Sequence, residues 1–138
     1  MINNSKSNHA IIVIKNKENK YLQYYDERWD SYLFLNCKLY DDNNNEIIKE
    51  YVSNQLNIDI NKITSIYVGE KVHTKFSESA KKEKEYQHYF YDVKIEGIDS
   101  LLIDNTKYRW YSYDELLNDD RIKKVNSDIV GFIKEFNL

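Results

Sequence analysis

The sequence predicts an α+β fold. Segments rich in β-branched and aromatic residues, which favour strands, outnumber helical segments and do not alternate with them regularly. Long stretches with helical spacing of apolar residues occur at residues 46–57 and 120–136. The 138 residues fit one domain of ordinary size with a real hydrophobic core. We therefore expect a single domain over residues 1–138.

The first half of the chain predicts three strands and a helix. Residues 8–15 contain the run Ala-Ile-Ile-Val-Ile, which is typical of a buried strand. Apolar and aromatic residues at 20–25 and 32–39 predict two more strands. A helix follows at residues 46–57, and Asn57 can end it because Asn tolerates the left-handed conformation. The apolar stripe of this helix consists of Ile47, Ile48, Tyr51, Val52 and Leu56.

The next segments predict a hairpin and a short strand. Residues 63–76 and 86–95 are both rich in residues that favour strands. Between them, the charged residues 77–85 predict a mobile loop. Residues 108–113 predict the last strand.

Two helices complete the predicted order, β-β-β-α-β-β-β-α-α. Ser112 and Glu115 have the spacing of a capping box, which predicts a short helix at residues 114–117. The last helix, at residues 120–136, carries one apolar stripe. The expected core includes Ile12, Ile14, Val52, Leu56, Trp110, Ile129 and Phe132.

Composition and charge exclude several classes of function. Cys37 is the single cysteine, so the chain has neither an internal disulfide nor a cysteine-based zinc site. The net charge is −3 and basic residues cluster only at 81–84, which argues against an extended nucleic-acid surface. No stretch of 18 apolar residues exists to span a membrane, and residues 1–8 lack the apolar core of a signal peptide. We expect a cytoplasmic protein.

Three stretches in order along the chain, at residues 32–39, 50–59 and 108–117, resemble the Nudix hydrolase family. Residues 32–39, Tyr-Leu-Phe-Leu-Asn-Cys-Lys-Leu, stand where members usually read like Trp-x-Phe-Pro-Gly-Gly-Lys-Val. Residues 50–59 resemble the helix of the Nudix box, and residues 108–117 resemble a late Trp-x-x-x-x-Glu-Leu element. The box spacing is kept without an insertion. The resemblance implies an α/β/α sandwich around a mixed β-sheet, and Mg²⁺-dependent hydrolysis of a diphosphate.

The residues that hold the metal in this family are largely replaced. Asn36 and Cys37 stand in place of two glycines, Asp42 stands in place of Glu, and Glu50 replaces Arg. Tyr51 replaces the next Glu, and the paired glutamates become Asn54 and Gln55; a register shifted by one residue also loses the pair. Hard cations such as Mg²⁺ need anionic oxygen ligands. We therefore expect no metal or other cofactor.

The favoured hypothesis is a non-catalytic module that binds a nucleotide-like or aromatic ligand, or a protein partner. Two readable cations suggest an uncharged or weakly anionic ligand rather than a polyphosphate. A purely structural role as an oligomer subunit is a further alternative, and the chain is expected to be a monomer or a homodimer. The candidate ligand-binding residues are Arg28, Tyr32, Lys38, Tyr51, Asn54 and Gln55.

The alternative is a diverged Nudix-type hydrolase of nucleoside-diphosphate-linked compounds. It would use Mg²⁺ with Asp42, Glu46, Glu50 and a glutamate near the long loop, Glu70. The histidines show no zinc-binding spacing, although His73 and His88 lie in neighbouring predicted strands and could face each other.

Overall fold

The computed structural model describes residues 7–39, 44–77, 80–101, 103 and 105–138, and its elements follow the order expected from the sequence. The strands are β1 (Ser7–Val13), β2 (Tyr21–Asp26), β3 (Ser31–Lys38), β4 (Ile63–Ser77), β5 (Lys82–Ile95) and β6 (Tyr108–Tyr111). The helices are α1 (Asn44–Leu56), α2 (Tyr113–Asn118) and α3 (Asp120–Glu135), with short 3₁₀ turns at Ile60–Lys62 and Ile98–Ser100. No helix of the described residues combines the length and apolarity needed to cross a membrane.

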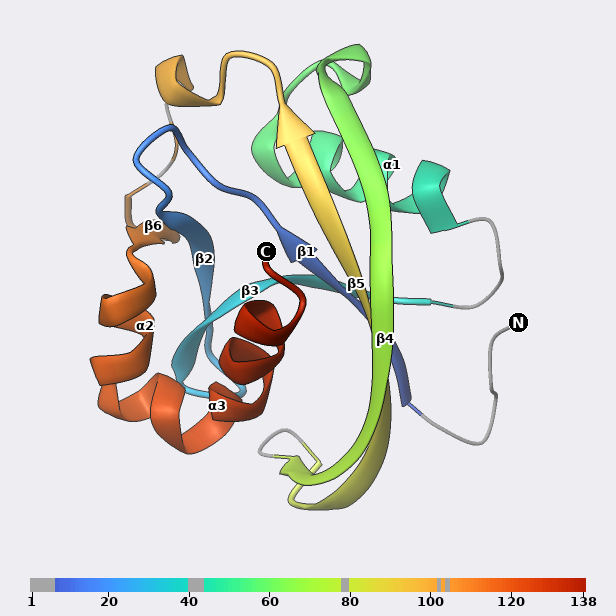
Figure 1. The fold of residues 1–138 in the computed structure, drawn as a ribbon, viewed down its shortest axis with the longest axis vertical. Helices are drawn as coiled ribbons and strands as arrows, with labels where there is room; N and C mark the ends of the chain where they lie inside the picture. The colour runs from blue at the N-terminus through green and yellow to red at the C-terminus, as the bar shows by residue number, and fades with distance from the viewer. Residues whose placement is uncertain (1–6, 40–43, 78–79, 102, 104) are drawn as a thin grey trace.

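Within the described residues, the strands form one mixed sheet in the order β4-β5-β1-β3-β2-β6. Strand β1 pairs with β5 in parallel, and the other neighbouring pairs are antiparallel. Strands β4 and β5 form a long curved hairpin that extends beyond α3 (Figure 1). This extension brings residues far from the sheet centre toward the turn between β2 and β3.

Helices cover both faces of the sheet, with α1 on one side and α2 and α3 on the other (Figure 1). Because successive residues of a strand point to opposite faces, β1 contributes to two cores. Ile12 and Ile14 pack with the buried side chains of α1, whereas Ile11 and Val13 pack with those of α3. The architecture is the predicted α/β/α sandwich around a mixed sheet.

Local signals in the sequence end and begin the helices as predicted. Asn57 follows α1 with a φ of 54°, the left-handed conformation that terminates a helix. Ser112 caps α2, and its hydroxyl oxygen accepts from the Glu115 backbone N–H while the Glu115 carboxylate accepts from the Ser112 N–H. Both predictions are confirmed.

Two details differ from the predictions. The segment 77–85 is not wholly a loop, because β5 begins at Lys82 and its first residues pair with the end of β4. Cross-strand pairing thus overrides the polarity of this segment. Of the expected core, Trp110 and Phe132 are only half-buried, whereas the other five residues are buried. Trp110 lies on β6, which forms an edge of the sheet.

Candidate ligand-binding site

A cavity of about 420 Å³ lies where the β4–β5 hairpin, β1 and β3 meet the turn after β2 and the helices α1 and α3. This volume is within the range of small-molecule sites, roughly 300–1,000 Å³. Four cationic side chains line it, and none of the described lining residues carries a carboxylate. The cations are Arg28, Lys38, Lys75 and Lys84.

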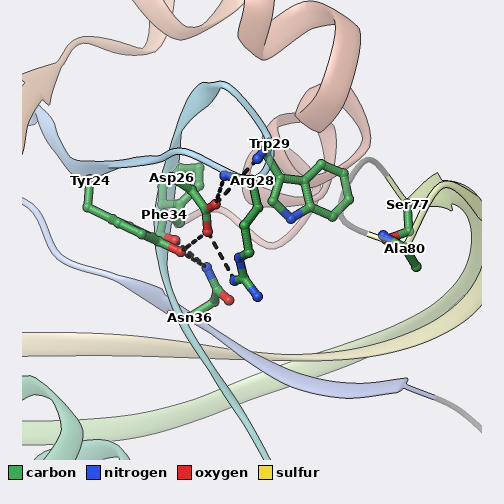
Figure 2. Close-up of polar contacts among 8 residues, drawn as sticks. All are labelled: Tyr24, Asp26, Arg28, Trp29, Phe34, Asn36, Ser77 and Ala80. Atoms are coloured by element: carbon green, nitrogen blue, oxygen red, sulfur yellow. Dashed lines mark hydrogen bonds and ion pairs between the residues drawn. The ribbon is translucent and has the colours of Figure 1, made fainter.

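Arg28 is held beside the cavity by a buried carboxylate (Figure 2). Its backbone N–H donates to Asp26 Oδ1 at 2.9 Å, and its guanidinium Nη2 donates to Oδ2 at 3.3 Å. Arg121 of α3 donates to the backbone carbonyls of Trp29 and Asp30, each at 2.8 Å. The turn that carries Arg28 is therefore fixed both by β2 and by α3.

Tyr24 and Asn36 extend this hydrogen-bond network across the sheet. The Tyr24 hydroxyl donates to Asp26 Oδ2 at 2.9 Å and accepts from Asn36 Nδ2 at 3.2 Å (Figure 2). Burial and the nearby Asp26 carboxylate raise the pKa of Tyr24, so the phenol remains a donor. Burial raises the pKa of Asp26, but the hydrogen bonds from Arg28 and Tyr24 outweigh it, and the net shift is downward.

A second network approaches the cavity from β4 and α3. Lys75 Nζ donates to Asp128 Oδ1 at 3.0 Å and lies 5.4 Å from the centre of a Trp29 ring, a cation–π distance. His73 Nδ1 lies 2.9 Å from Asp128 Oδ2. Burial would raise the pKa of Asp128, but the contacts with His73 and Lys75 lower it well below its usual range. Asp128 is therefore a carboxylate at neutral pH.

Strand β5 supplies a wall of alternating residues. Lys84, Tyr86 and His88 all line the cavity, as expected for side chains two residues apart on one strand. The rings of Tyr86 and His88 stack at 5.3 Å with an interplanar angle of 9°, and Lys84 Nζ lies 5.7 Å from the Tyr86 ring. Aromatic faces of this kind suit a planar ligand.

The cavity wall formed by Tyr51 of α1 and by Asn36 and Cys37 of β3 is uncharged. Burial raises the pKa of the Tyr51 phenol, with smaller contributions from Cys37 and Tyr108, so it carries no charge near pH 7. Burial also raises the pKa of the Cys37 thiol to about 11, which leaves it protonated and a poor nucleophile. Asn36 and Cys37 pair with Ile11 and Ala10 along β3, so the strand continues where the Nudix pattern has two glycines.

Of the six ligand-binding candidates, Arg28, Lys38 and Tyr51 line the cavity. The other three lie elsewhere. Tyr32 packs against Tyr25 and Tyr111, at ring distances of 5.5 and 5.6 Å. Asn54 is exposed on α1, and Gln55 accepts from the Tyr108 hydroxyl through its backbone carbonyl at 3.1 Å.

The candidate catalytic carboxylates are not gathered at the cavity. Glu46 and Glu50 are exposed on α1, where Glu46 Oε1 lies 3.5 Å from Lys49 Nζ. Glu70 is exposed on β4 and accepts a hydrogen bond from Gln87. Asp42 lies outside the described residues. Among the residues that the structure places, no three His, Cys, Asp or Glu side chains are arranged to hold a metal ion.

The sequence interpretation missed Lys75, Lys84 and Tyr86 as site residues. The period-two alternation of strand residues could have indicated these positions. Lys71, His73 and Lys75 share one face of β4, and Lys84, Tyr86 and His88 share one face of β5. The face of β4 that meets the cavity is identified by its contact with Asp128 of α3. The position of α3 relative to β4 is known only from the folded structure.

No protein-family model matches the sequence, and no curated protein matches it closely enough to count. Solved structures do match the fold. The chain is similar to an Ap4A hydrolase of C. elegans (TM-score 0.62, 12% identity, 96% of each chain covered). It is also similar to a MutT protein of Methanosarcina mazei Go1 (TM-score 0.63, 14% identity, 99% of this chain and 96% of that one). A UDP-X diphosphatase matches all of this chain and 67% of its own, with TM-score 0.59 and 13% identity. The fold is therefore Nudix-like.

Proposed function

We propose that this chain is a Nudix-fold binding module whose cavity takes an aromatic ligand that carries a phosphate or carboxylate group, without metal-dependent hydrolysis. The observation that carries the proposal is the lining of the cavity, which combines four cations with the aromatic side chains of Trp29 and Tyr86. A planar group would stack on the aromatic side chains, and the cations would contact the anionic group.

The charge of the ligand is limited by the carboxylates beside the cavity. Asp26 and Asp128 already pair with Arg28 and Lys75. Four cations, two of them so paired, do not neutralise the roughly four negative charges of a nucleoside triphosphate, and unpaired charge is costly once water is excluded. A nucleoside monophosphate or an aromatic carboxylate fits this balance better. The sequence suggested two cations, and Lys75 and Lys84 shift the expectation from a neutral toward an anionic ligand.

The experiment is calorimetric titration with adenosine, AMP and ATP in the presence of EDTA. We expect AMP to bind more tightly than adenosine, and ATP to gain nothing over AMP. Replacing a cavity cation by Lys84→Met should weaken AMP binding by about tenfold, the effect of one charged hydrogen bond. Lys123→Met removes a charge from an exposed position of α3 and is the matched control.

The hydrolase alternative is tested with nucleoside-diphosphate-linked compounds in the presence of Mg²⁺ instead of EDTA. Metal-dependent turnover of nucleoside diphosphate derivatives above about 1 s⁻¹, the low end of ordinary enzymes, would replace the proposal. Loss of that turnover in Glu46→Gln would then place the reaction on α1. Equal binding of adenosine and AMP would show instead that the cations do not serve the ligand.

A further inference from the structure

Three side chains from three elements form a continuous chain that ends at the cavity. Asp128 lies on α3, His73 on β4 and His88 on β5. His73 Nδ1 is 2.9 Å from Asp128 Oδ2, and His73 Nε2 is 2.7 Å from His88 Nδ1. His88 lines the cavity, and the residue is 6% exposed.

The positions of the protons follow from the carboxylate. An ionised carboxylate has no proton to donate, so its oxygen at 2.9 Å favours a proton, rather than a lone pair, on His73 Nδ1. In neutral His73 the Nε2 atom then holds a lone pair, and the 2.7 Å contact requires His88 Nδ1 to donate to it. The remaining ring nitrogen of neutral His88, Nε2, therefore has a lone pair.

The surroundings of His88 keep it neutral. Burial lowers the pKa of His88 well below its ordinary value of 6.5, and the neighbouring His73, His9 and Lys75 lower it further. The ring is also held in place, because Tyr86 stacks on it and Nδ1 is engaged by His73. A ring fixed in both tautomer and orientation is a directional hydrogen-bond acceptor.

We infer that Asp128 and His73 fix His88 as an acceptor for the ligand, so that the cavity selects anions that also carry an N–H or O–H donor. This rests on the proposed function and specifies its ligand class. A nucleoside monophosphate belongs to the class, because its sugar hydroxyls and base amino group donate. Phenyl phosphate offers the aromatic ring and the phosphate without a further donor outside the phosphate. Asp128 and His73 are positioning residues, and His88 contacts the ligand.

The first test needs no ligand. The chain has three histidines, so long-range ¹H–¹⁵N spectra at pH 8 resolve them with single variants for assignment. We expect both His73 and His88 to carry their proton on Nδ1. In Asp128→Ala, the histidines should no longer hold their protons only on Nδ1. Asp120→Ala should leave the tautomers unchanged, because the Asp120 side chain is 97% exposed on the same helix. A proton on Nε2 of His88 in the unmodified chain overturns the inference.

The second test compares two probes, AMP and phenyl phosphate. His88→Phe should weaken AMP binding by about tenfold and phenyl phosphate binding by less than twofold. His88→Gln, whose side-chain oxygen can accept, should restore part of the AMP affinity. Equal losses for the two probes would make His88 a shaping residue only and overturn the inference. If neither probe binds to the unmodified protein, the proposed function is overturned. The tautomers of His73 and His88 are measured without a ligand, so they test the inference separately.

Discussion

Along α1, the buried side chains are apolar and the carboxylates are exposed, whereas the cavity gathers charged and ring groups. Ile48, Val52 and Leu56 bury one stripe of the helix, and Glu46 and Glu50 face solvent. Beside the cavity, the buried Asp26 and the half-buried Asp128 are held by hydrogen bonds and ion pairs.

The difference separates the part of the molecule that stabilises the fold from the part where we propose that a ligand binds. Burial of apolar groups favours folding, whereas burial of charged groups costs free energy unless they are well paired. In the Nudix resemblance the chemistry belongs to the helix corresponding to α1. Here that helix packs against the sheet, and the ionisable groups that are costly to bury lie at the cavity.

The largest effect is expected in the apolar core on the α3 side. Ile129 is 1% exposed and packs among the buried side chains of α3, β1 and β5. Ile129→Ala should lower the free energy of unfolding by about 2–5 kcal/mol, because it removes buried methyl groups and leaves a cavity. Leu117→Ala, at an exposed position of α2, is the control and should cost about 0.5 kcal/mol or less. A loss below about 0.5 kcal/mol for Ile129→Ala in denaturant melts would show that α3 is not docked.

Sequence reasoning succeeded where the signal was local or periodic. The capping box at Ser112 and the left-handed Asn57 depend on neighbouring residues, and both were predictable. The order of strands and helices also followed from periodicity. The start of a strand could not be predicted where polar residues pair across strands, as in the first residues of β5.

The site could be predicted only in part, because it depends on contacts between distant segments. Arg28, Lys38 and Tyr51 were proposed as ligand-binding residues and do line one cavity. Asp128 is 53 residues from Lys75 in the chain, and nothing in the sequence pairs them. Gln55 was assigned to the site by its motif position, but it contacts Tyr108, which approaches α1 from β6.

An intermediate effect is expected from the pH dependence of stability. The folded protein lowers the pKa of His88, so the unfolded chain binds a proton more readily than the native state. The stability that His88 contributes is fully present above the unfolded pKa of about 6.5 and is lost as the pH falls below it. The free energy of unfolding should therefore fall by up to about 1.4 kcal/mol per pH unit between pH 6.5 and 5.

Comparison with two variants isolates this contribution. His88→Phe should flatten the profile between pH 6.5 and 5, whereas His9→Gln should leave most of the slope in place. The measurement is a series of denaturant melts at fixed ionic strength. Parallel profiles for the unmodified protein and His88→Phe would show that the native state does take up a proton at His88, against the buried, neutral ring described here.

The smallest effect is expected from Mg²⁺ at α1. Glu46 and Glu50 lie one turn apart on the exposed face of the helix, and Mg²⁺ binds tightly only where several oxygen ligands converge. A ligand present at a hundredfold excess over its dissociation constant would stabilise the protein by about 2.7 kcal/mol. We expect 10 mM Mg²⁺ to change the free energy of unfolding by less than about 0.5 kcal/mol. The Glu46→Gln variant should show the same small response to Mg²⁺. Its stability without Mg²⁺ should also be close to that of the unmodified protein, since the exposed contact between Glu46 and Lys49 contributes little to folding. Stabilisation by Mg²⁺ that disappears in Glu46→Gln would move the functional centre back to α1 and favour a diverged hydrolase.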